Sequence, residues 1–81
     1  MERNEVFERL TKIFRDVFDD ENLVITDATN ADDIEDWDSL EQITLVVTIE
    51  KEFEIKFNVH EVSGFKNVGE MADAILLKAK Y

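Results

Sequence analysis

Apolar residues recur with a helical period between positions 3 and 18, and this pattern constrains the fold more than any other feature of the sequence. Seven apolar side chains fall on one continuous helix face: Val6, Phe7, Leu10, Ile13, Phe14, Val17 and Phe18. A helix with such a face must bury it against other elements of the same domain. The chain has 81 residues, the length of one small domain, so we expect a single domain over residues 1–81.

A second helix is predicted over residues 39–53. The segment Ser39-Leu40-Glu41-Gln42 matches a capping box, with Ser39 as the N-cap and Gln42 three residues later. The apolar face of this helix is expected to contain Leu40, Ile43, Val46, Val47 and Phe53. Residues 45–49 would also permit a strand, because several of their side chains are β-branched, but the capping signal favours the helix.

Two shorter helices are predicted in the last third of the chain. Asn58 opens a short helix, which Gly64 is expected to end as a residue in the left-handed conformation. Asn67 opens the last helix, and Lys78 and Lys80 near its end complement the helix dipole. The apolar face of the last helix contains Val68, Met71, Ala72, Ile75 and Leu76.

Residues 19–38 show no sustained period and are rich in Asp, Asn and Thr, which predicts a long loop between the first two helices. The apolar cluster at 23–25 and Ile34 are expected to pin this loop to the core, with a short strand at 23–26 as an open alternative. Residues 55–57 predict an extended connector. Loops of about twenty residues in small domains are commonly functional. The predicted fold is therefore all-α, a bundle of three to four helices with a long loop between helices one and two.

The negative charge is concentrated in one segment. The formal charge at pH 7 is −11, and twelve of the 20 acidic residues lie between Asp16 and Glu50, a window without Lys or Arg. This balance argues against nucleic acid, whose phosphates require basic side chains. It favours partner proteins with basic patches, whose encounter with the chain the charge would steer. The alternative is that the acidic segment is a solvated loop without a partner.

The residue types argue against several kinds of site. The chain has no Cys and one His, so it offers neither a disulfide nor a ligand set for zinc. The acidic loop contains no Gly and does not match an EF-hand, so we expect no dedicated metal site. No signal peptide is recognisable, and no apolar run approaches the ~20 residues of a membrane span. We expect a soluble, cytoplasmic protein.

Asp38-Ser39-Leu40, at the predicted start of the second helix, is the strongest candidate for a functional motif. One interpretation is that Ser39 only caps the helix. A catalytic triad of Ser39, His60 and an Asp is weaker, because the chain shows neither an oxyanion hole nor a substrate cleft. Trp37, directly before the motif, is expected to anchor the core; a partner contact and a lid over the helix start are alternatives.

With this motif the chain resembles the acyl carrier proteins over essentially its whole length. The shared features are the helix order, the long loop after helix one, the acidic balance, the Asp-Ser-Leu motif at 38–40 and the run from Ile49 to Phe57. In that family the serine of the motif carries 4′-phosphopantetheine through a phosphodiester. The resemblance implies that Ser39 is the attachment site, that a phosphopantetheinyl transferase modifies it, and that the protein carries acyl groups and is not an enzyme.

The resemblance also implies partners and a cargo. Acyl-transferring and synthase enzymes with basic patches would dock on the monomeric carrier through Asp38, Leu40, Glu41, Val47 and Glu50. Inward residues would either line a space for an acyl chain or only pack the core: Ile43, Val46, Phe53 and Ile75. The pathway would be fatty-acid, lipid or polyketide synthesis.

Several residues depart from the family pattern. Thr44 and Lys51 stand where acidic residues are usual on the second helix, and Asn58 stands where Pro would follow the connector. Asp36 stands where many members have Gly, and Trp37 stands where a small residue is common. These differences favour a carrier dedicated to a particular pathway over ordinary fatty-acid synthesis. The alternative function is that of an acidic helical adaptor, which binds basic partner proteins without a prosthetic group.

Overall fold

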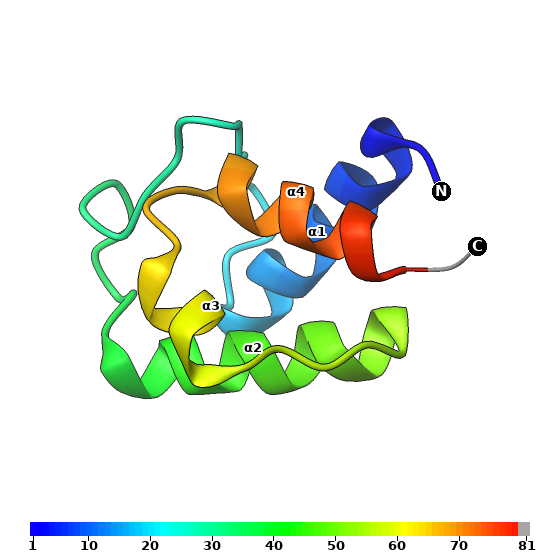
Figure 1. Cartoon of the computed structure of the whole chain (residues 1–81). Helices are drawn as coiled ribbons and strands as arrows, with labels where there is room; N and C mark the ends of the chain where they lie inside the picture. Colours follow the sequence, from blue (N-terminus) through cyan, green and yellow to red (C-terminus); the bar gives the residue numbers. More distant parts are fainter. Residues whose placement is uncertain (80–81) are drawn as a thin grey trace.

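Four helices make up the regular structure of residues 1–79, the part of the chain that the computed structural model describes (Figure 1). They are α1 (Arg3–Val17), α2 (Ser39–Phe53), α3 (Val59–Gly64) and α4 (Val68–Lys78). Within these residues there is no strand, so the alternative of a strand at 23–26 is wrong. The all-α fold with a long loop after the first helix is confirmed. Lys80, expected to complement the dipole of α4, lies outside the described residues.

The core forms where α1 packs against both α2 and α4. Helix α1 contributes its predicted face, of which Val6, Leu10, Ile13 and Phe14 are buried. Helix α4 contributes Val68, Met71, Ala72 and Ile75, which were also predicted to lie inward. These two faces agree with the sequence pattern because the apolar residues of each helix are concentrated on one side, although Leu77 of α4 is exposed.

The predicted apolar face of α2 is wrong over its first two turns. Leu45, Ile49 and Phe53 point into the core, whereas the exposed fractions of Leu40, Ile43 and Val47 are 69%, 62% and 44%. Apolar side chains lie on both sides of α2, so its periodicity does not define one face. Contact with α1 decides which side is buried, and the other side remains as an exposed apolar stripe.

Two residues that follow helices have a left-handed backbone conformation, and neither is a glycine. Glu54 follows α2 with φ 55°, and Asp19 lies just after α1 with φ 49°. Gly64 is instead the last residue of α3, and no glycine has a positive φ, so its predicted left-handed conformation is wrong. The glycine that the fold does require is Gly69. A Cβ atom there would lie 2.9 Å from the backbone oxygen of Asp27, so only glycine lets α4 approach the loop so closely.

The long loop is held against the bundle at several points. Ile25 and Ile34 are buried, as predicted. The Val68 N–H donates to the Thr29 carbonyl oxygen (2.8 Å), which ties the loop to the start of α4. The guanidinium of Arg3 forms ion pairs with Asp27 of the loop and Asp73 of α4. The loop is therefore anchored next to both helices, and it reaches the start of α2 at the end of the molecule opposite the first turn of α1 (Figure 1).

A reciprocal capping box stabilises α3. The Glu61 N–H donates to the Asn58 side-chain oxygen (2.8 Å), and the Asn58 N–H donates to Glu61 Oε1 (3.0 Å). Lys78 of α4 forms an ion pair with the same Glu61 oxygen (2.9 Å). The hydrogen bond from Asn58 and, next, the contact with Lys78 hold the pKa of Glu61 below its usual value. The carboxylate thus links α3 to α4 in its charged form.

We expect Glu61→Gln to lower the melting temperature at neutral pH, with an effect that shrinks as the pH falls. A depressed pKa in the folded state stabilises the protein above the unfolded pKa, and this stabilisation is lost as the pH falls through the folded pKa. Thermal unfolding of both proteins from about pH 7 to about pH 3 measures the difference. The control is Glu35→Gln, which removes an exposed loop carboxylate. A difference between wild type and Glu61→Gln that does not change with pH would contradict the prediction.

Candidate functional site

Asp38, not Ser39, caps helix α2. Asp38 has an extended backbone, with φ −114° and ψ −171°, and its Oδ1 accepts a hydrogen bond from the Glu41 N–H (2.9 Å). The Asp38 carbonyl accepts from Gln42 N–H (2.9 Å), the first hydrogen bond of the helix. The predicted cap was therefore wrong by one residue, and Ser39 is the first residue inside the helix.

This shift leaves the Ser39 hydroxyl unused. The residue is exposed, and its hydroxyl makes no hydrogen bond with any residue in the described part of the chain. The first N–H groups of a helix have no partner within the helix, and the aligned peptide dipoles make this end positive. A hydroxyl at this position suits attachment of an anionic group such as a phosphate ester.

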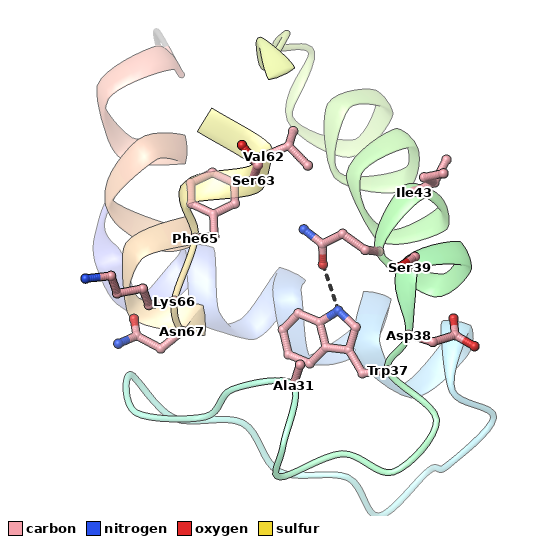
Figure 2. Close-up of a pocket in the computed structure, with 11 residues that line it drawn as sticks. Ala31, Trp37, Asp38, Ser39, Ile43, Val62, Ser63, Phe65, Lys66 and Asn67 are labelled. Carbon is pink, nitrogen blue, oxygen red and sulfur yellow. Dashed lines mark hydrogen bonds between the residues drawn. The ribbon is translucent and has the colours of Figure 1, made fainter. Parts of the chain in front are cut away.

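Trp37 anchors the segment before the motif to the core, as predicted. Its ring packs edge-on against Phe14 of the core, with ring centroids 5.3 Å apart, and lies 6.2 Å from Phe18. The indole Nε1–H donates to Gln42 Oε1 (2.7 Å; dashed line in Figure 2). With Asp38 as the cap, Trp37 directly precedes the cap and Gln42 is the fourth residue after it. Two apolar side chains often pack together at these positions, whereas here a hydrogen bond joins the pair. The start of α2 is thus fixed to the core.

A pocket of about 620 Å³ opens beside Ser39. Figure 2 shows Ser39 and Ile43 of α2 on one side, with Val62 and Phe65 across from them. The remaining lining residues are Ala31, Trp37, Asp38, Gln42, Ser63, Lys66 and Asn67. The pocket therefore combines apolar walls with polar groups, which is the usual composition of a ligand site.

The structure divides the residues that were predicted to line a space for an acyl chain. Ile43 lines the pocket, whereas Phe53 and Ile75 are fully buried in the core. Gln42 was predicted only as part of the capping box with Ser39, whereas in the structure it binds the Trp37 indole and lines the pocket. Val62 and Phe65 were also missed, and no local pattern indicates them, because they reach the pocket from α3 and the segment after it.

The residues predicted to contact partners are spread along α2. Asp38, Leu40 and Glu41 lie next to Ser39 in the first turn, while Val47, eight residues further, lies ~12 Å along the helix axis. Glu50 is half-buried, and its Oε2 accepts a hydrogen bond from the Phe57 N–H (2.8 Å). This bond ties the connector after α2 to the helix, so Glu50 has a structural role besides any contact with a partner.

Other kinds of site find little support in residues 1–79. His60 is exposed in the first turn of α3 and shares no hydrogen bond with Ser39 in that part of the chain. Among the same residues, no group of three His, Cys, Asp or Glu side chains is placed to hold a metal ion. No helix there is both long and apolar enough to cross a membrane.

Comparisons with known proteins agree with the geometry of this site. A family model described as a phosphopantetheine attachment site matches residues 8–75. The fold is similar to the solution NMR structure of a holo acyl carrier protein from Geobacter metallireducens, with a TM-score of 0.85 and 45% sequence identity. That similarity covers 90% of this chain and 84% of the other.

Proposed function

Because this chain belongs to the acyl carrier protein family, whose members carry covalently attached 4′-phosphopantetheine and catalyse no reaction themselves, we propose that Ser39 is its attachment residue. The observation that carries the proposal is the free, exposed hydroxyl of Ser39 at the first position of α2. This hydroxyl is free because the side chain of Asp38, not that of Ser39, caps the helix. The adjoining pocket offers room for an arm extending from this residue. A phosphate at this position gains from the positive end of the helix dipole.

The prosthetic group supplies a thiol on which acyl groups are held as thioesters. The chain itself has no Cys, so no protein thiol competes with this one. The protein would act as a cytoplasmic monomer in fatty-acid, lipid or polyketide synthesis. A carrier dedicated to a particular pathway is favoured by Trp37, which stands where the family commonly has a small residue.

The test is modification of the purified chain by a promiscuous phosphopantetheinyl transferase with coenzyme A. We expect the intact mass to increase by one phosphopantetheinyl group, and fragmentation to place the group on residue 39. An established carrier protein modified in parallel is the positive control. If that control gains the group and this chain does not, or gains it elsewhere, the proposal is wrong.

Partner enzymes would dock on the first turns of α2. Asp38 and Glu41 supply negative charge there, and Leu40 and Val47 supply exposed apolar surface, with further charge from Glu50. Basic residues around the site of a transferase or synthase would complement this pattern. Such contacts would be weak and short-lived, as a shuttle requires.

Glu41→Lys should lower the second-order rate constant for modification severalfold at low ionic strength, and the loss should shrink as salt is added. Exposed charges act over a Debye length of ~8 Å at physiological ionic strength, and added salt shortens it. Transferase kinetics at increasing salt measure this effect. Glu2→Lys is the matched control, because it changes the net charge equally at the opposite end of the molecule (Figure 1). Equal losses in the two variants would argue against docking at α2.

A further inference from the structure

The Trp37–Gln42 pair at the pocket beside Ser39 presents a hydrogen-bond donor in a fixed orientation. Indole nitrogen can only donate, so the side of the Gln42 amide that meets it must be the oxygen. The Gln42 amide nitrogen, which carries two hydrogens, then points away from the indole. It makes no hydrogen bond with the described residues, and Gln42 is half-buried among the residues that line the pocket.

The orientation of this amide is secured from the core. Trp37 is held by its edge-on packing against Phe14 and by Phe18, and its indole in turn holds Gln42. An isolated exposed glutamine would lose side-chain freedom on binding a ligand. Here that freedom is already restricted in the absence of a ligand, so a hydrogen bond to the amide nitrogen costs less to form.

The chemistry around this donor matches an amide-containing chain. Gln42 follows Ser39 by three residues, so the two side chains lie on adjacent turns of the same side of α2. Ile43, Val62 and Phe65 supply apolar surface around the donor. The phosphopantetheine arm has amide carbonyls separated by short hydrocarbon segments, and it would begin at Ser39.

We propose that Gln42 donates a hydrogen bond to an amide carbonyl of the arm carried by Ser39, and that Trp37 is the positioning residue that aims it. This inference rests on the proposed function. The pair holds the arm in the pocket against Val62 between deliveries, and a partner enzyme withdraws it. Loss of one such hydrogen bond should reduce the ratio of held to free arm about fivefold.

The experiment uses the holo protein, made with an arm whose geminal methyl groups are isotopically labelled. Nuclear Overhauser effects between these methyls and the Val62 methyls report the held arm. We expect them in the wild type, and we expect weaker effects in Gln42→Met and Trp37→Phe, because the ratio of held to free arm should fall about fivefold. Gln42→Glu retains an acceptor for the indole N–H but removes the donor, so it should weaken them too. Val24→Ala, which changes an exposed loop residue outside the pocket, should leave them unchanged.

The outcomes separate this inference from the proposed function. If intact mass shows no modification of Ser39, the proposed function fails and the inference falls with it. If modification is complete but the wild type shows no contact between the arm and Val62, only the inference is wrong. Contacts that persist undiminished in Gln42→Met and Gln42→Glu would also overturn it. Amide spectra of each unmodified variant establish that the fold is retained. If one of the two Gln42 variants does not fold, the other still tests the inference.

Discussion

Replacing Ser39 with alanine should abolish the addition of phosphopantetheine completely. The substitution removes the only atom on which the proposed modification takes place, so no residual activity is expected even with excess transferase. The fold should be unaffected, because the cap of α2 is Asp38 and the Ser39 hydroxyl makes no hydrogen bond within residues 1–79. Alanine is also a favourable helix residue. Intact mass after transferase treatment and a melting curve of the apo protein are the two measurements.

The matched control is Ser63→Ala in the same pocket. Its hydroxyl donates to the Val59 carbonyl (3.0 Å), and the variant should be modified like the wild type. If Ser39→Ala still gains the group, the attachment site lies elsewhere. Ser39→Ala also distinguishes the proposed carrier function from the alternative function of an adaptor. An adaptor without a prosthetic group would keep its complete function in Ser39→Ala, whereas a carrier would keep partner docking and lose all acyl transfer.

Replacing Phe14 with alanine should remove most of the free energy of unfolding, so that the protein is largely unfolded or only marginally stable. The side chain is fully buried between the helices and supports the edge of Trp37. Truncation of a buried phenylalanine typically costs about 3–5 kcal/mol. Small domains lie near the low end of the ~5–15 kcal/mol range of folding stabilities, so this loss removes most of the total.

Denaturant titration followed by Trp37 fluorescence measures this effect, because Trp37 is the only tryptophan in the chain. The midpoint should fall sharply, and any native emission that remains should shift to longer wavelength as the indole becomes more exposed. Val24→Ala is the control, because Val24 is 70% exposed in the loop and its truncation should change the stability by less than ~0.5 kcal/mol. Comparable losses in the two variants would mean that Phe14 does not support the core as described.

The helices that were predicted best are those whose signals are local and consistent. Asn58 and Asn67 cap their helices through bonds that span three residues, so the pattern of four adjacent side chains is sufficient to predict them. The faces of α1 and α4 were predictable for a similar reason. Each has one apolar side, and burial of any other side would expose it.

The errors lie where two local solutions are nearly equal in energy. Asp38 and Ser39 are both good N-caps, and the choice of Asp38 is consistent with Trp37 reaching both Phe14 and Gln42. Helix α2 has apolar side chains on both sides, and its contact with α1 selects Leu45 and Ile49 over Leu40 and Ile43. Neither choice can be derived from residues adjacent in the chain.

The sequence by itself determined the class of fold, the order and approximate extent of the helices, the acidic segment and the motif that contains Ser39. These depend on side-chain period, capping and charge, which act over a few residues. Only the tertiary structure decided that the Ser39 hydroxyl is free, that an apolar stripe of α2 remains exposed, and that Val62 and Phe65 complete a pocket beside it. These features require segments far apart in the chain to meet: Trp37 packs against Phe14 of α1, and Phe65 packs against Phe57 of the connector after α2.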